Sequence, residues 1–171
     1  MLRLSGPSAV DALQALTKRE IPLARRAVLR DISCPASGEH IDQCLVLCFP
    51  GPTSFTGEDV VELQLHGSRA VSNAALRSLG AMPGLRVAEP GEFSRRAFLN
   101  GRMDLTQLEG LADLIDAETE LQRVVALGQM GGGLKRLYDG WREELVRCLA
   151  HFEAAIDFGE APSHYPTPPT R

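Results

Sequence analysis

Apolar and polar positions alternate in short runs through the first half of the chain, and these runs predict strands. Residues 27–32 and 41–49 are rich in Val, Leu and Ile, and a Pro-Ala-Ser-Gly-Glu sequence at 35–39 separates them. Runs of this kind joined by a short turn are typical of a hairpin, so we expect two antiparallel strands here. The Pro-Gly-Pro sequence at 50–52 ends the second strand.

Three further strands and two helices are predicted around this hairpin. Residues 2–5 and 85–87 predict short strands and residues 60–66 a longer one, because apolar side chains alternate with polar ones. Pro7 suits the first turn of a helix, and residues 68–79 have apolar side chains at helical spacing. Strands and helices in this order, without an internal repeat, indicate an α+β domain with a mixed or antiparallel sheet.

Beyond the predicted strands the pattern becomes helical. A short helix is expected after Pro90-Gly91, and Asn100-Gly101 ends it. Asp104 and Gln107 have the spacing of a capping box, in which each side chain satisfies a backbone N–H of the other. The apolar positions from Leu108 to Thr119 then predict a long amphipathic helix with acidic residues on its outer face.

A second long helix is predicted through residues 141–156, where Trp, Leu, Phe and Ile recur at helical spacing. Three consecutive glycines, 131–133, lie between the two long helices. Three glycines cost on the order of 3 kcal/mol relative to alanine in a helix interior. We therefore expect a break at the glycines and a helical hairpin in place of one continuous helix.

The composition is that of an ordinary globular protein. The chain has 171 residues and a hydrophobic fraction of 44%, which excludes disorder of the whole chain. The longest charge-free run, 43–57, is interrupted by Pro and Gly, so no membrane span is expected. Cys44 and Cys48 are four apart, but no second pair has zinc-binding spacing. Core packing is favoured over metal binding for this pair. The four sparse cysteines do not indicate a disulfide frame, and a structural role is favoured for the four histidines.

The charge is distributed unevenly along the chain. The net charge of −4 combines +1 over residues 1–104 with −5 over residues 105–158. This shift marks a domain boundary. We expect an α+β domain over 1–103, the start of a helical domain over 104–158, and a disordered Pro-rich tail over 159–171.

The predicted strand 60–66 has one polar face, formed by Glu62, Gln64 and His66. The simpler interpretation is a sheet with one face in water. The functional interpretation is the floor of a polar cleft, where the Glu62 carboxylate accepts paired N–H donors from the edge of a guanidine-like ring. The sequence pattern alone leaves both interpretations open.

Two groups of cations have a functional and a structural interpretation. Arg102 follows a tight turn, where it either binds a ligand carboxylate or lies solvated on the surface. Arg95 and Arg96 either form a solvated helix face or contact an anion or RNA. The sequence contains no nucleotide-binding phosphate loop, nucleophile elbow or dinucleotide fingerprint, and no strong basic run marks a nucleic-acid surface.

Two long segments identify a family. Residues 49–67, Phe-Pro-Gly-Pro-Thr-Ser-Phe-Thr-Gly-Glu-Asp-Val-Val-Glu-Leu-Gln-Leu-His-Gly, resemble the signature of the MnmE (TrmE) tRNA-modification GTPases. Residues 90–120, which begin Pro-Gly-Glu-Phe-Ser-Arg-Arg-Ala-Phe-Leu-Asn-Gly-Arg-Met-Asp-Leu, resemble the same family without a gap. The resemblance covers residues 2–158. The Ile-Asp-Phe-Gly-Glu sequence at 156–160 is most similar to the animal mitochondrial member, which implies a mitochondrial protein, with a cytoplasmic one as the alternative.

The resemblance implies a fold and a function. The N-terminal domain of the family is similar to the folate-binding domain of the glycine-cleavage T-protein, forms a homodimer, and binds 5-formyl- or 5,10-methylene-tetrahydrofolate between subunits. A helical domain follows, into which a GTPase domain with its GTP, Mg and K sites is inserted. Together with an FAD-dependent partner, MnmG, the family modifies carbon 5 of the wobble uridine of certain tRNAs, and the mitochondrial version uses taurine.

The folate-contacting positions of the family are carried over one by one. The Arg of the family's Arg-Ile-Ser-Gly sequence falls on Arg3, within Arg-Leu-Ser-Gly. The Glu of the strand after Thr-Gly-Glu-Asp falls on Glu62, and the Lys or Arg after the Asn turn falls on Arg102. By this resemblance, Glu62 matches the pterin edge, and Arg3 and Arg102 match the polar groups and carboxylate tail of folate.

The sequence also departs from the family pattern. Family members begin with a further strand and a Gly-rich loop before the position of Arg3, and they continue past Phe158 into the GTPase domain and a C-terminal cysteine motif. We therefore expect a truncated gene model, isoform or fragment that holds folate and dimerises but catalyses nothing alone. The alternative is a non-catalytic assembly module that has lost folate binding. An aminomethyltransferase-like enzyme is disfavoured, because the segment after Asp104 matches MnmE and not the T-protein.

Overall fold

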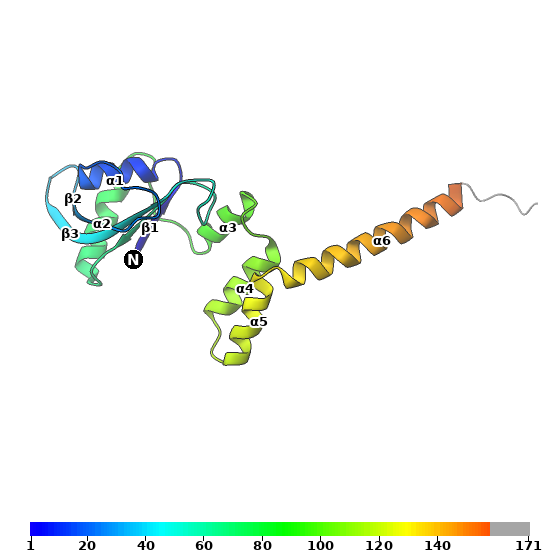
Figure 1. The fold of residues 1–171 in the computed structure, drawn as a ribbon. Coiled ribbons are helices and arrows are strands. Elements are labelled where there is room, and N and C mark those ends of the chain that lie inside the picture. Colours follow the sequence, from blue (N-terminus) through cyan, green and yellow to red (C-terminus); the bar gives the residue numbers. More distant parts are fainter. Residues whose placement is uncertain (158–171) are drawn as a thin grey trace, which may run out of the picture. The chain divides into compact units, whose positions relative to one another are not determined.

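The computed structural model of the chain describes residues 1–157, so the tail predicted over 159–171 lies outside the described residues. The first half contains a four-stranded sheet in the order β1-β4-β3-β2, in which every neighbouring pair is antiparallel (Figure 1). The strands are β1 (Leu2–Ser5), β2 (Val28–Ser33), β3 (His40–Phe49) and β4 (Val60–Gln64). The predicted α+β class and the hairpin of β2 and β3 are confirmed.

Two helices, α1 (Ala9–Thr17) and α2 (Arg69–Gly80), pack on one face of the sheet. Alternate residues of the strands point to this face, as the two-residue period of a strand requires. Cys44 and Cys48 are among them, at 2% and 3% exposure, so they pack in the core. The buried cluster consists of Leu4, Ala9, Ala12, Leu13, Leu16, Ile32, Cys44, Val46, Cys48, Val61, Leu63 and Leu79.

The intervening strand residues point to the other face of the sheet. Leu29 of β2 lies opposite Leu45 of β3, and both are partly in water, at 55% and 44% exposure. In the same register Glu62 of β4 lies between Leu47 of β3 and Arg3 of β1. The sheet thus brings an acidic and a basic side chain together from strands that are far apart in the sequence.

The strand predicted over residues 85–87 is wrong. This segment pairs with no strand within residues 1–157. The N–H of Leu85 donates to the carbonyl oxygen of Met82 at 3.3 Å, and the Arg86 side chain binds Glu92. A short apolar run becomes a strand only where a neighbouring strand offers backbone partners, and local sequence does not reveal this.

The second half is helical, as predicted, with α3 (Glu92–Leu99), α4 (Leu105–Ile115), α5 (Glu120–Met130) and α6 (Gly133–Asp157). The capping box at the start of α4 is confirmed. The Gln107 N–H donates to Asp104 Oδ1 at 3.0 Å, and the Asp104 N–H donates to Gln107 Oε1 at 3.0 Å. The break at the glycines is also confirmed, because α5 ends at Met130 and α6 begins at Gly133.

The long helix predicted to run through Thr119 is wrong in its extent. It ends at Ile115, and Thr119 is instead the N-cap of α5. The Gln122 N–H donates to Thr119 Oγ1 at 3.2 Å, while Gln122 Oε1 accepts the Thr119 N–H at 2.9 Å. This second capping box turns the expected hairpin of two helices into three helices, α4, α5 and α6.

The chain divides into two compact units, Met1–Leu108 and a second that begins at Glu109. The first contains the sheet, its buried cluster and helices α1, α2 and α3. The second contains α5, α6 and most of α4, and none of the residues of α6 is buried.

Candidate ligand-binding site

Arg3 and Glu62 form an ion pair across β1 and β4. They are direct partners in the antiparallel register, and Nε and Nη2 of Arg3 donate to Glu62 Oε1 at 2.8 and 2.6 Å. The two side chains are 30% and 15% exposed, so the carboxylate is the more buried partner. The pair forms because antiparallel pairing places position 3 opposite position 62, with both side chains on the face away from the core.

Two aromatic rings flank the guanidinium group of Arg3. Its central carbon lies 5.6 Å from the ring centroid of Phe55 and 5.8 Å from that of Phe93. Both distances are in the range of cation–π attraction. The second oxygen of Glu62, Oε2, accepts only a long hydrogen bond from Gln64 Nε2, at 3.4 Å, among residues 1–157. The site thus combines a positive planar group, aromatic surface and one lightly used carboxylate oxygen.

The turn after α3 holds the loop that carries Phe55. Asn100 Nδ2 donates to the carbonyl oxygen of Thr56 at 2.7 Å, and Arg102 Nε donates to that of Ser54 at 3.2 Å. Gly57 has a φ of +81° and lies so close to Asn100 that a Cβ atom there would be 3.0 Å from the Asn100 Cβ. Glycine at 57 therefore permits both the loop conformation and its close contact with the turn.

Arg86, Glu92 and Arg96 form a charged cluster beside β1. The Glu92 carboxylate accepts Arg86 Nη1 and Nη2 at 2.8 and 2.6 Å and Arg96 Nη2 at 2.9 Å. Its side chain is 12% exposed. The Arg86 guanidinium, the Glu89 N–H and Arg96 together lower the pKa of Glu92 to about 2, so the group is ionised at neutral pH.

Arg96 connects this cluster to β1. Its Nη1 also donates to Glu58 Oε2 at 3.0 Å, and the hydroxyl of Ser5 donates to the same oxygen at 2.9 Å. The Ser5 hydroxyl lies 2.6 Å from the Thr56 hydroxyl. Arg96 is therefore bound within the protein, whereas the sequence left a solvated surface or an anion contact as its role.

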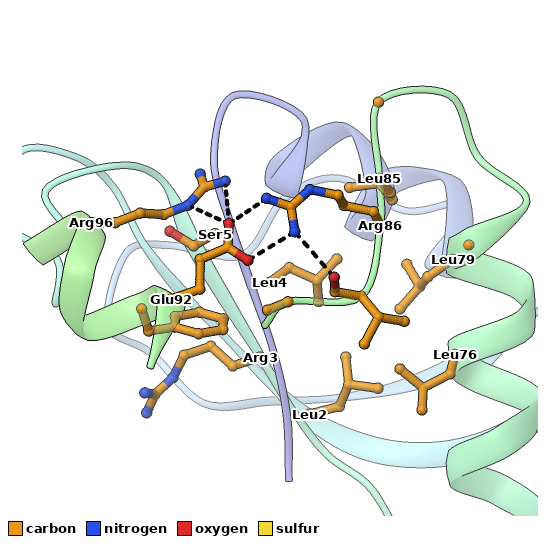
Figure 2. A pocket seen from close by; sticks show the side chains of 15 residues that line it. Leu2, Arg3, Leu4, Ser5, Leu76, Leu79, Leu85, Arg86, Glu92 and Arg96 are labelled. Atoms are coloured by element: carbon orange, nitrogen blue, oxygen red, sulfur yellow. Dashed lines mark hydrogen bonds and ion pairs between the residues drawn. The ribbon is translucent and has the colours of Figure 1, made fainter. Parts of the chain in front are cut away.

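A cavity of about 310 Å³ lies between β1, α2, residues 84–88 and α3 (Figure 2). Leu2, Leu4, Leu76 and Leu79 provide its apolar wall, and the charged cluster of Arg86, Glu92 and Arg96 lies at one end. Arg3 and Phe93 also line it. The cavity thus reaches the ion pair of Arg3, although Glu62 is not part of its lining.

Of the three residues predicted from the sequence, Arg3 and Glu62 are in direct contact. Arg102 bonds to Ser54, the neighbour of the Phe55 that flanks Arg3. Within residues 1–157 no hydrogen bond or ion pair joins Arg102 to either partner, and none occupies its terminal nitrogens. The loop of Ser54 and Phe55 therefore links Arg102 to the Arg3–Glu62 pair.

Sequence reasoning missed several residues of this region. Phe55 and Phe93 were not identified, because their contacts with Arg3 join segments far apart in the chain. The charged cluster was not identified either, although its members lie within residues 86–96. The only local signal was the spacing of Glu92 and Arg96, four residues apart on α3, which favours an ion pair.

His66 does not continue the polar face of β4, because the strand ends at Gln64. Its N–H donates to Asp42 Oδ2 at 2.9 Å, and its Nδ1 lies 2.8 Å from Asp42 Oδ1. Burial alone would raise the pKa of Asp42, but the hydrogen bonds from His66 and from the Gln43 N–H lower it overall. The contact fixes the end of β4 against β3.

The described part of the chain carries neither a metal-ligand cluster nor a membrane-crossing helix. No three His, Cys, Asp or Glu side chains gather as metal ligands within residues 1–157. None of the helices in that range has the length and apolarity that a membrane crossing requires.

The first unit is an antiparallel α+β fold with an Arg–Glu pair at its edge strand, and helices follow it along the chain. This order defines a protein with an N-terminal α+β domain and a helical domain. Residues 1–102 match the family described as GTP-binding protein TrmE N-terminus, and residues 105–166 match the MnmE helical domain. The chain belongs to this MnmE (TrmE) family.

Relatives in bacteria and animals are similar over most of the chain. The tRNA modification GTPase MnmE of Parvibaculum lavamentivorans is 59% identical over 158 residues, which is 92% of this chain and 36% of the relative. The human mitochondrial 5-taurinomethyluridine-[tRNA] synthase subunit GTPB3 is 58% identical over 161 residues, 94% of this chain and 33% of the relative. The zebrafish GTPB3 is 56% identical over 160 residues. The chain spans about a third of the length of these relatives.

Proposed function

We propose that this chain is the tetrahydrofolate-binding and dimerising front part of a tRNA modification GTPase. Residues 1–103 hold 5-formyl- or 5,10-methylene-tetrahydrofolate and pair with a second copy, and residues 104–158 begin the helical domain. The complete assembly modifies carbon 5 of the wobble uridine together with an FAD-dependent MnmG-type partner. The names of the bacterial and animal relatives support the tRNA reaction, and those of the animal relatives support a mitochondrial setting.

The observation that carries the folate assignment is the Arg3–Glu62 pair. The edge of a pterin ring presents adjacent N–H donors, which a carboxylate accepts well. Arg3 orients the Glu62 carboxylate through Oε1, and Oε2 has only the long bond from Gln64 at 3.4 Å. The Phe55 and Phe93 rings add apolar, planar surface beside the pair. The residues present therefore fit a pterin.

Arg102 is the proposed partner of the folate tail. A guanidinium group binds a carboxylate with two parallel hydrogen bonds, and the terminal nitrogens of Arg102 are not engaged by another group within residues 1–157. Its Nε bond to Ser54 fixes the stem of the side chain relative to the loop of Phe55. When bound, the tetrahydrofolate supplies the one-carbon unit. The chain's own residues bind and orient it.

Titration of 5-formyl-tetrahydrofolate into the chain by calorimetry tests this assignment. We expect binding that Glu62→Ala abolishes and Arg102→Gln weakens, while the fold measured by circular dichroism is preserved. Arg142→Gln, which removes a charge from the exposed helix α6, is the matched control and keeps wild-type binding. Absence of heat with the folded wild-type chain at micromolar protein would exclude the folate assignment.

Light scattering on the same samples tests dimerisation. A dimer that binds folate is the expected result. A dimer that does not bind folate would identify the chain as an assembly module. A monomer that binds folate would contradict the dimerisation part of the proposal.

A further inference from the structure

The segment from residue 18 to residue 30 is strongly basic in a chain whose net charge is −4. It contains five cations and a single acid, Glu20. None of the five has a carboxylate within ion-pair distance among residues 1–157. Arg25 alone has described side-chain partners, the carbonyl oxygen of Thr53 and the ring of Phe49. The five cations are Lys18, Arg19, Arg25, Arg26 and Arg30.

Three of these cations line a second hollow of the first unit. It has a volume of about 350 Å³ and lies where the end of α1 meets β2. Lys18, Arg19 and Arg30 line it together with one acid, Asp31, whose Oδ1 already accepts Gln43 Nε2 at 3.0 Å. We call this site the basic hollow. Its charge balance favours an anion.

Arg30 provides the second observation. It lies opposite Cys44 in the sheet and has the same orientation as Ile32, toward the core side. Its Nε is buried and has no hydrogen-bond partner in the described part of the chain. A buried N–H without an acceptor is unfavourable, and such groups are rare in proteins. An anion in the hollow would bring an acceptor to the guanidinium group of Arg30, which lines it.

The C-terminal end of helix α1 repels an anion only weakly. The last carbonyl groups of a helix carry partial negative charge. Here the Thr17 hydroxyl donates to the Leu13 carbonyl oxygen at 2.9 Å, and the Lys18 N–H donates to that of Gln14 at 2.8 Å. Two of these carbonyl groups are therefore already satisfied, and the cations determine the sign of the local field.

We propose that the basic hollow binds the phosphate backbone of RNA. Guanidinium groups match phosphate oxygens, and phosphate contacts position a nucleic acid without reading its sequence. Residues 17–33 contain no aromatic side chain on which a base could stack, so backbone contact is favoured over base readout. The choice of RNA over other phosphates rests on the proposed function in tRNA modification. The basic hollow would position the tRNA, separately from the folate site.

The test is fluorescence anisotropy of the 171-residue chain with a labelled tRNA transcript between about 50 and 200 mM salt. The Lys18→Gln/Arg19→Gln double variant is expected to weaken binding on the order of tenfold at low salt and to reduce the salt slope by about two. Both side chains are exposed, so the fold is preserved. Arg30→Gln should weaken binding further, with its fold checked by circular dichroism.

The matched control is Arg142→Gln/Arg147→Gln, which makes the same charge change on exposed positions of α6. Retention of tRNA binding by this control, with loss in the Lys18/Arg19 variant, supports the basic hollow. Equal loss in both variants, or no loss in either, overturns it. Binding of inorganic phosphate alone, or of vesicles with anionic lipid but not tRNA, also overturns the RNA assignment. Folate titration of the Lys18/Arg19 variant should be unchanged. Failure of the RNA proposal can therefore be distinguished from failure of the folate proposal.

Discussion

Arg3 and Glu62 are direct partners across β1 and β4, and two nitrogens of the arginine reach the same carboxylate oxygen at 2.8 and 2.6 Å. The ion pair is partly shielded from water, at 30% and 15% exposure of the two side chains. Partial shielding strengthens a charge pair relative to one that is fully in water. The pair therefore contributes to stability as well as to the proposed ligand site.

A double-mutant cycle with Arg3→Gln and Glu62→Gln measures that contribution. We expect a coupling free energy of unfolding of about 1 kcal/mol, at the upper end for a partly exposed pair. The control is the Glu120–Arg123 pair on α5, which is 75% and 49% exposed and should give a smaller coupling free energy, because water screens the two charges. Urea unfolding of the four proteins in each cycle provides the values. Equal coupling in both cycles would contradict the shielding argument.

Glu92 makes stability depend on pH in the acid range. Hydrogen bonds from Arg86, the Glu89 N–H and Arg96 lower its folded-state pKa to about 2, from an ordinary value of 4.5. A lowered pKa means that Glu92 contributes fully above pH 4.5 and that this contribution is lost as the pH falls toward about 2. Glu92→Gln should flatten the loss of stability across that window.

Thermal unfolding at a series of pH values measures this effect. Arg86→Gln should remove part of the same dependence, because its guanidinium is the largest cause of the lowered pKa. If Glu92→Gln and the wild-type chain lose stability in parallel below pH 4.5, the assignment is wrong.

The cysteines should differ in reactivity. Hydrogen bonds from the hydroxyls of Ser37 and Ser78 lower the pKa of Cys34 to about 6, so the thiolate predominates at neutral pH. Burial and the charge of Asp42 raise the pKa of Cys44 to about 11. Iodoacetamide should therefore modify Cys34 well before Cys44, and the rate at Cys34 should fall as the pH decreases through about 6.

Peptide mapping by mass spectrometry follows both sites in one sample. Ser37→Ala removes the largest cause of the lowered pKa of Cys34 and should slow its alkylation at neutral pH. An unchanged rate in that variant would show that the Ser37 hydroxyl does not stabilise the thiolate.

Two helical glycines should respond in opposite directions to alanine. A Cβ at Gly110 of α4 would lie 2.8 Å from the Gln129 Cβ and 2.9 Å from the Met130 backbone nitrogen, so Gly110→Ala must separate α4 from α5. A Cβ at Gly140 of α6 meets no atom of the described residues within 4 Å. We expect Gly140→Ala to stabilise by about 0.5–1 kcal/mol and Gly110→Ala to destabilise by about 1–3 kcal/mol. Helix content measured against urea distinguishes the two.

The sequence was sufficient to predict the structure wherever one local rule determined it. The β2–β3 hairpin, the Asp104–Gln107 cap and the break at Gly131–Gly133 all depend on neighbours within a few residues. The prediction of a strand at residues 85–87 failed because a strand needs a partner strand that lies elsewhere in the sequence. The end of α4 was predicted wrongly because Thr119 fits two positions equally well, the apolar side of a continuing helix and the N-cap of a new one.

The candidate site was predictable only in part. Glu62 was identified from the alternation of its strand and from the family resemblance, and Arg3 and Arg102 were carried over from the family. Their surroundings depend on pairing between segments up to 59 residues apart, as with Arg3 and Glu62. No sequence period encodes such contacts. The basic hollow was missed for a different reason: its cations, Lys18, Arg19 and Arg30, form no continuous basic run, and the fold gathers them.

Helix α6 has a consequence for how the chain melts. None of its residues is buried within residues 1–157, and its apolar side chains are largely in water, including Trp141, Leu145 and Phe152 at 53%, 70% and 71% exposure. A helix with so little tertiary packing depends mainly on its own marginal propagation free energy. Calorimetry of the chain should therefore contain one sharp, cooperative transition from the sheet and its core. The ellipticity of α6 should decline gradually with temperature, without a heat-capacity peak of its own.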